Sequence, residues 1–217
     1  MCGRFNLIAD VAQVCASFEL ERVEAYQPRF NIAPGQAILN ITQLPDDNRQ
    51  AAYCHWGLIP SWAKDSKMSS HLINARAETL SEKPSFRAAY KQRRCLLPAT
   101  GFYEWAQTAH GKQAYHISRE DGELFAFAGL WEYWEHAADI IYSCTIITTA
   151  ANALLQPIHT RMPVIIAPQQ YAHWLDASQT PASLQALLAQ DAYAAMTVKP
   201  ISARVNNPWH DDADCLH

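Results

Sequence analysis

The middle of the chain reads RCLLPATGFYEWAQTAHGKQAYHISREDGELFAFAGLWEYWEHAADIIYSCTIITT (94–149). Apolar, β-branched and aromatic runs alternate here with polar turns, which predicts strands at 94–99, 101–107, 113–118, 124–133 and 139–149. The turns AHGK (109–112) and EDGE (120–123) have the length of hairpin connections. This density of short strands favours a curved, barrel-like, mainly antiparallel sheet.

The flanking sequence adds a few peripheral elements to this sheet. Apolar spacing and proline at two first turns predict helices at 9–20, 85–93, 168–175 and 181–190. Alternation predicts further strands at 36–42, 50–59, 162–166 and 195–202. No repeat or linker interrupts the pattern, so we expect a single α+β domain over 1–217, with a core at about 2–205 and a mobile tail at 206–217.

Composition narrows the class of protein. The 217 residues are 49% hydrophobic and 18% charged, which suits one self-sufficient globular domain. The formal net charge is -4, so any nucleic-acid site must be a local basic patch. The sequence has neither a run of 18 apolar residues nor a basic-then-apolar leader, and we expect no membrane span and a cytoplasmic protein.

Cofactor motifs are absent from the sequence. The six cysteines, at 2, 15, 54, 95, 144 and 215, do not have zinc-ligand spacing, and no glycine-rich nucleotide motif occurs. We therefore expect no metal and no cofactor. Cys95 and Cys144 lie in apolar runs and are expected to be small buried core residues.

The N-terminal stretch MCGRF raises a chemical question. Aminopeptidases remove Met1 when the second residue is small, and the chain would then begin with Cys2, which carries an α-amine and a thiol on one residue. Both groups titrate within about two units of neutral pH. The alternative is that Cys2 is part of an inert terminal tail.

Three other stretches combine polar groups that suit catalysis. In LINARAET (72–79), Asn74, Arg76 and Glu78 would share one face of a strand, which is either a cleft wall or a solvated face. In GFYEWAQ, Glu104 stands between aromatic residues, and burial there would raise its pKa; the alternative is a charge on an edge strand. IHTRMP (158–163) places His159 two residues before Arg161.

Together these groups form a coherent set. An amine that attacks an aldehyde forms a Schiff base, which needs proton transfer. A thiol on the neighbouring carbon can then close a five-membered thiazolidine, and only an N-terminal cysteine supplies both groups. Arginines would bind phosphates and fix the position of the substrate.

The chain resembles the SOS response-associated peptidase (SRAP) family, whose members crosslink to abasic sites in single-stranded DNA. The resemblance runs from residue 2 to about 205. It is carried by MCGRF, RFNIAPGQ, HWGLIPSWAKD, LINARAET, RRCLLPATGFYEW, FAFAGLWE, CTIITTAAN and IHTRMPVI, in the family's order and spacing.

The resemblance implies specific roles. Cys2 would form the crosslink with the ring-opened abasic sugar, and Asn74 would orient that sugar. Glu104 would open the sugar ring and move protons, and His159 would assist Schiff-base chemistry and crosslink reversal. The DNA-binding residues would be Arg4, Asn31, Pro34, Trp62, Arg76, Thr148 and Arg161, with Trp62 able to stack on a base.

The family resemblance also implies how Met1 is removed, which partner the protein binds and where in the cell it acts. The peptidase activity in the family name would be self-processing that exposes Cys2, although a host aminopeptidase could also remove Met1. The partner would be single-stranded DNA with abasic sites, and replication-fork association is compatible with this. We expect a monomer that is nucleoid-associated when bound.

Three rival functions use the same N-terminal residue differently. An N-terminal-cysteine glutamine amidotransferase also begins Met-Cys-Gly, but the arginine-glycine-proline segment of that class is absent. A non-covalent single-strand binding module would bind intact and abasic strands equally. A thiol protease would cleave other proteins through Cys2.

Overall fold

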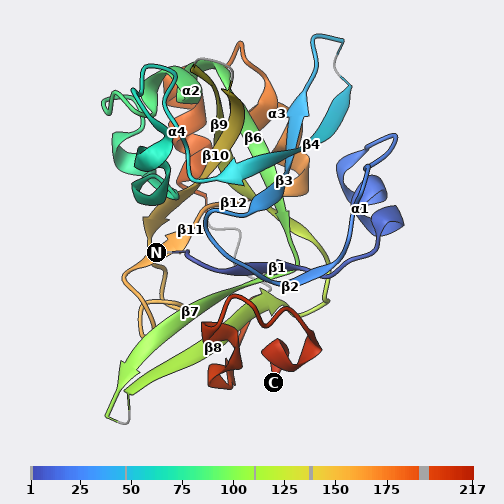
Figure 1. Cartoon of the computed structure of the whole chain (residues 1–217), viewed down its shortest axis with the longest axis vertical. Coiled ribbons are helices and arrows are strands. Elements are labelled where there is room, and N and C mark those ends of the chain that lie inside the picture. The colour runs from blue at the N-terminus through green and yellow to red at the C-terminus, as the bar shows by residue number, and fades with distance from the viewer. Residues whose placement is uncertain (1, 47, 110, 137–138, 191–195) are drawn as a thin grey trace.

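The computed structural model describes residues 2–46, 48–109, 111–136, 139–190 and 196–217 (Figure 1). The strands in these residues are β1 (Phe5–Leu7), β2 (Arg29–Ile32), β3 (Ala37–Gln43), β4 (Arg49–Trp56), β5 (Asn74–Arg76), β6 (Arg94–Ala99), β7 (Gly101–Thr108), β8 (Gly111–Arg119), β9 (Phe125–His136), β10 (Asp139–Ala150), β11 (Arg161–Pro163), β12 (Ile165–Ile166) and β13 (Met196–Ile201).

The helices in the described residues are short and peripheral. The α-helices are α1 (Val11–Phe18), α2 (Arg87–Gln92), α3 (Tyr171–Leu175) and α4 (Pro181–Leu188). The 3₁₀ turns are η1 (Ser66–His71), η2 (Ala77–Thr79), η3 (Pro168–Gln170), η4 (Ala203–Asn206) and η5 (Ala213–Leu216). No helix in these parts of the chain is long and apolar enough to cross a bilayer.

One sheet closes into a barrel. Strand β9 pairs antiparallel with β6 on one side and with β10 on the other, and the ring is completed by β10–β4, β4–β3 and β3–β6 pairs. The β10–β4 pair is parallel, while the other pairs of the ring are antiparallel. The predicted α+β fold with a barrel-like sheet is therefore confirmed.

A second sheet lies against the mouth of the barrel, in the order β13-β8-β7-β1-β2. Its short strand β1 lies between β7 and the edge strand β2, because Phe5 pairs with Phe102 of β7 and with Ile32 of β2. The Phe5 ring enters the barrel core, where it meets Trp56 and Phe127 edge-on at centroid distances of 5.2 and 5.7 Å. Burial of these large rings fixes the start of the chain relative to both sheets.

The predicted strands of the barrel are observed within a few residues, but the short strands β1 and β2 lay below the sequence signal. The strand expected within 72–79 is observed only as β5 (Asn74–Arg76), and Glu78 lies in η2 rather than on the strand face. The single strand predicted at 162–166 is divided into β11, which pairs with β10, and β12, which pairs with β9. Val164 bridges the two, because it donates to the Ile147 carbonyl and accepts from Ala128. Residues 110 and 195, within a predicted turn and a predicted strand, lie outside the described residues.

The prediction of a mobile tail at 206–217 is wrong. Cys215 is fully buried in a small core with Tyr103, Ala114 and Val205. Figure 1 shows this red C-terminal segment packed along β2, β7 and β8, on the side away from the barrel. The acidic sequence of the segment concealed its role, because its carboxylates bond to strand β2 rather than to water: Asp211 accepts from the backbone N–H groups of Phe30 and Asn31.

Candidate active site

The backbone of Cys2 is anchored by residues far away in the sequence. The side-chain amide of Asn74, at the start of β5, donates to the Cys2 carbonyl oxygen over 2.9 Å. Two residues after Cys2, the Arg4 carbonyl accepts from the backbone N–H of Tyr103 over 2.9 Å. Cys2 thus lies where the start of the chain passes between β5 and β7.

The Cys2 side chain is fully buried in this chain, which still carries Met1; Met1 itself lies outside the described residues. Its Sγ lies 4.0 Å from the Arg4 carbonyl oxygen. Burial raises the pKa of the Cys2 thiol strongly, and the negative charge of Glu104 raises it further. The thiol is therefore protonated at neutral pH.

Glu104 faces the site from β7, which lies between β1 and β8 and is not an edge strand. The side chain is only 3% exposed. Burial raises the pKa of the Glu104 carboxyl, and the nearby His159 ring acts in the opposite direction. The neighbouring Tyr103 and Trp105 point to the other face of the strand, into the C-terminal core, so burial arises from the barrel side rather than from these aromatic residues.

His159 approaches from the loop before β11. Its Nδ1 accepts from the backbone N–H of Arg161 over 2.9 Å, and the Arg161 carbonyl oxygen lies 3.1 Å from the same nitrogen. Because the backbone N–H is an obligatory donor and the closer of the two groups, we assign Nδ1 as the acceptor and place the proton of the neutral ring on Nε2. Glu104 acts on the pKa of the Cys2 thiol, and His159 acts on the pKa of Glu104, so the three side chains share one site.

Arg161 is held beside this site by a carboxylate. Its Nη1 and Nη2 donate to the two Glu78 oxygens over 2.6 and 3.0 Å, and Nη2 also donates to the Thr148 carbonyl oxygen over 2.6 Å. The Arg161 side chain is 17% exposed and that of Glu78 is 48% exposed. The Arg161 fork, predicted to bind phosphate, is therefore occupied by Glu78, and the buried Thr148 hydroxyl faces Arg161 and Ala75.

Arg4 and Asn31 belong to an internal network. Arg4 Nη1 donates to Asn31 Oδ1 over 2.9 Å and to the Val205 carbonyl over 2.8 Å. Asn31 is fully buried, and its Nδ2 donates to the carbonyls of Val205, Asn207 and His210. Both side chains, predicted to contact DNA, thus join the N-terminal strand to the C-terminal segment.

The other predicted DNA-binding residues are at the surface. Arg76 is exposed and forms no ion pair with the described residues. Trp62 is 56% exposed, with its indole N–H directed to the Pro84 carbonyl over 3.5 Å. Pro34 is exposed at a turn where Gly35 has a φ of +85°, a conformation that favours glycine. Arg76 is therefore the cation of this set most available to a phosphate.

A buried polar network behind the site was not predicted. Asn6 Nδ2 lies 2.9 Å from both the Tyr103 hydroxyl and His116 Nε2, and its Oδ1 accepts from the Thr100 hydroxyl over 2.8 Å. Burial lowers the pKa of His116 to about 4, so the ring is neutral and accepts from Asn6. Its members come from β1, the connection between β6 and β7, β7 and β8, so no single stretch of the sequence signals the network.

We also considered a surface hollow and possible metal-binding clusters as alternative sites. A hollow of about 670 Å³ between the segment after α1 and the β3–β4 hairpin has a net acidic lining, and none of the predicted site residues lines it; its charged residues are Glu19, Glu21, Glu24, Asp46, Arg22 and Arg49. Such an acidic lining disfavours a phosphate backbone. Within the described ranges no group of three or more metal-ligating side chains comes together.

Comparison with known proteins gives a consistent assignment. The family model "SOS response associated peptidase (SRAP)" matches residues 1–208. The chain is 41% identical to the abasic site processing protein YoaM of Bacillus subtilis, over 100% of this chain and 97% of that protein. It is 31% identical to the abasic site processing protein HMCES of Xenopus tropicalis, over 89% of this chain and 67% of that protein.

A solved structure has the same fold. A crystal structure of a protein from Bacteroides thetaiotaomicron superposes with a TM-score of 0.86 at 26% identity, covering 99% of this chain and 98% of that one. The fold therefore agrees over almost the whole length, including the C-terminal segment. The chain belongs to the SRAP family.

Proposed function

We propose that this protein processes abasic sites in single-stranded DNA and that, after loss of Met1, Cys2 forms a covalent thiazolidine crosslink with the abasic sugar. The names of its relatives, which are abasic site processing proteins, support the substrate class. The observation that carries the chemistry is the convergence of Cys2, Asn74, Glu104 and His159 from four separate elements.

Opening of the sugar ring comes first. The Glu104 carboxylate takes the proton of the C1′ hydroxyl and returns it to the ring oxygen as the C1′–O4′ bond breaks, which leaves an aldehyde. A raised pKa suits this exchange, because a carboxyl group that titrates closer to neutrality both accepts and donates at working pH. The Asn74 amide, bonded to the Cys2 carbonyl, holds the attacking residue in place.

The α-amine of Cys2 then attacks before its thiol. The raised thiol pKa keeps sulfur protonated, so nitrogen is the nucleophile that adds to the aldehyde carbon. Loss of water gives the Schiff base, with His159 as the proton donor or acceptor. The thiol adds to the same carbon, its proton passes through Glu104 to nitrogen, and the ring closes with one water lost overall.

Strand binding uses the surrounding cations and aromatic groups. Exposed Arg76 and Trp62 are suited to a phosphate and a base respectively. Arg161 contributes to phosphate binding when its ion pair with Glu78 opens. Thr148, which accepts from Arg161, helps to position that side chain. Arg4, Asn31 and Pro34 shape the wall beside Cys2 rather than supply the main charge.

The wider biology follows from the same site. Self-processing at the Met1–Cys2 bond accounts for the peptidase in the family name, with a host aminopeptidase as the alternative agent. A crosslink that reverses through His159 and Glu104 would release a processed strand, as a lyase does. We place the protein in the cytoplasm, as a monomer, on the nucleoid when bound and at replication forks where single strands are exposed.

The test is adduct formation with an abasic oligonucleotide. Cys2→Ala is expected to give no heat-stable complex while it retains salt-sensitive binding. Cys2→Ser keeps the amine but lacks sulfur, so it should give an adduct only when borohydride reduces the Schiff base. A heat-stable complex of Cys2→Ala would refute the linkage, and equal retention of intact and abasic strands by the unaltered protein would indicate a binding module instead.

A further inference from the structure

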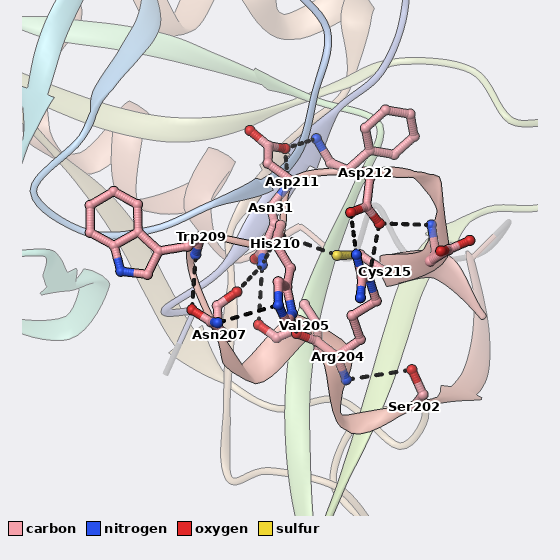
Figure 2. A network of polar contacts seen from close by, with 12 residues as sticks. Asn31, Ser202, Arg204, Val205, Asn207, Trp209, His210, Asp211, Asp212 and Cys215 are labelled. Carbon is pink, nitrogen blue, oxygen red and sulfur yellow. Dashed lines mark hydrogen bonds and ion pairs between the residues drawn. The ribbon is translucent and has the colours of Figure 1, made fainter.

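Trp209 is the most exposed large apolar side chain of the described residues, at 87%. It lies between η4 and η5, in the C-terminal segment that packs against β2. Figure 2 shows its indole projecting away from the polar network that surrounds the backbone of the turn. Almost the whole aromatic surface is therefore open to a partner.

The turn that carries Trp209 is held rigidly. Buried Asn31 donates from Nδ2 to the carbonyls of Asn207 and His210 over 3.0 and 2.7 Å, on either side of Trp209. The backbone N–H of Trp209 donates to Asn207 Oδ1 over 3.1 Å (Figure 2). A ring on a turn fixed in this way loses little further backbone freedom when it binds.

The same network leads to the active site. Arg4, two residues after Cys2, donates to Asn31 Oδ1 over 2.9 Å and to the Val205 carbonyl over 2.8 Å. Arg4 thus connects the residue proposed to capture the sugar with both sides of the Trp209 turn. Through Arg4 and Asn31, the Trp209 turn is linked to the start of the chain by two successive hydrogen bonds, so we take nucleotides some positions away from the captured sugar, rather than its immediate neighbours, as those within reach of the ring.

Two of the acidic residues after Trp209 are paired with arginines. Asp211 is paired with Arg29 and also accepts from the backbone of β2. Asp212 is paired with Arg204, while Asp214 is exposed and forms no ion pair with the described residues. The two pairs reduce the repulsion that a phosphate backbone would meet beside Trp209.

We propose that Trp209 is a second base-stacking platform, which stacks on an unpaired base a few nucleotides from the abasic site. This inference rests on the proposed function. The occupant is single-stranded DNA, because a solitary exposed ring among polar residues fits the face of one base. Stacking of this kind tolerates any sequence, since every base has a π face.

The test places 2-aminopurine at successive positions on either side of an abasic site in a single strand and compares the protein with Trp209→Ala. We expect quenching at one position or two adjacent positions with the unaltered protein, and loss of that quenching with Trp209→Ala. Affinity for the strand should fall by about 5- to 100-fold, and Trp209→Phe should restore part of it. The rate of crosslinking at saturating DNA should be unchanged.

Two matched controls sharpen the outcome. Trp62→Ala should relieve quenching at a different position, while Tyr142→Ala, which removes a 51%-exposed ring from β10, should relieve none. If the protein crosslinks but Trp209→Ala changes neither the quenching at any probe position nor the affinity, the inference is overturned and the proposed function stands. Quenching that depends on Trp209 without any crosslink overturns the proposed covalent chemistry instead. A change in oligomeric state with Trp209→Ala would assign the ring to a second copy of the chain and also overturn the inference.

Discussion

Asn74 donates to the carbonyl oxygen of Cys2 over 2.9 Å, across a separation of 72 residues. This bond joins the start of the chain to β5, which is itself aligned in parallel on β10. The other polar atom of the amide, Asn74 Oδ1, is buried and has no hydrogen-bond partner among the described residues. Asn74 therefore holds Cys2 with one atom and keeps an acceptor for a hydroxyl group with the other.

Asn74→Ala should slow crosslinking by about 10- to 100-fold, because the first residue loses its anchor and the attacking amine its orientation. Affinity for intact single-stranded DNA should change little, since the amide is not a cationic contact. Rates at saturating abasic DNA, with binding measured in parallel, separate the two effects. An equal loss in both would mean that Asn74 binds DNA and does not orient Cys2.

Glu104→Gln should reduce the crosslinking rate by about 10²- to 10⁴-fold, the range that general acid–base groups contribute. In the unaltered protein the rate should rise with pH as the carboxyl ionises, through a pKa that burial has raised. That limb should be missing in Glu104→Gln, while a rise due to the α-amine remains. A pH–rate profile with the same lower limb in both proteins would exclude Glu104 as the base.

Glu104 should also affect stability in a defined direction. Its folded-state pKa lies above the unfolded value of 4.5, so its stabilising contribution is complete below that pH and is lost as pH rises through the folded-state pKa. Glu104→Gln should therefore be more stable than the unaltered protein at pH 8 but not at pH 4. Urea unfolding at the two pH values measures this; greater stability of the carboxylate protein at pH 8 would contradict burial as the cause.

Glu78→Gln should strengthen binding to intact single-stranded DNA by about two- to fivefold, because a half-exposed ion pair that competes with phosphate is removed. The slope of log affinity against log salt should steepen by about 0.7, the value for one more phosphate contact. Arg76→Ala is the matched opposite, with a slope shallower by the same amount. Weaker binding by Glu78→Gln would mean that the Glu78–Arg161 pair is a structural brace and not a competitor.

The lowered pKa of His116 predicts that the protein loses stability on acidification. Its folded-state pKa of about 4 lies below the unfolded value of 6.5, so its contribution is complete above pH 6.5 and is lost as pH falls through 4. The loss should be about 2 kcal/mol, because part of the ring reaches solvent. His116→Gln keeps an acceptor for Asn6 and cannot titrate, so it should lose less stability between pH 6.5 and 4. Identical slopes in urea unfolding would exclude His116 as the origin.

Local sequence signals were sufficient for the barrel and for β7, β8 and β13 of the second sheet, but not for the short strands β1 and β2. Strands such as 94–99 carry long apolar runs, and their predicted bounds match β6. Strand β1 has only three residues, and its position depends on Phe5 entering the barrel, a tertiary contact that no local pattern encodes. The C-terminal segment was missed for a related reason, since Asp211 is paired in three dimensions with residues about 180 positions earlier.

The sequence identified which types of residue form the site, but not the contacts that each of them makes. From its local sequence, Glu104 was either buried among aromatic neighbours or exposed on an edge strand. The structure shows a third arrangement, in which it is buried on an inner strand while those neighbours point to the opposite face of β7. The arginines looked equivalent in the sequence, but Arg4 is half-buried and bonded to Asn31, Arg161 is held by Glu78 and Arg76 is exposed. These differences arise from partners distant in the chain, which only the folded arrangement reveals.

Intact mass spectrometry of the protein after incubation with an abasic single strand tests the central claim most directly. The account predicts one product with the mass of the chain without Met1 plus the oligonucleotide minus one water, with the oligonucleotide attached at Cys2. An adduct on the chain that retains Met1, or one attached to any residue other than Cys2, would contradict it.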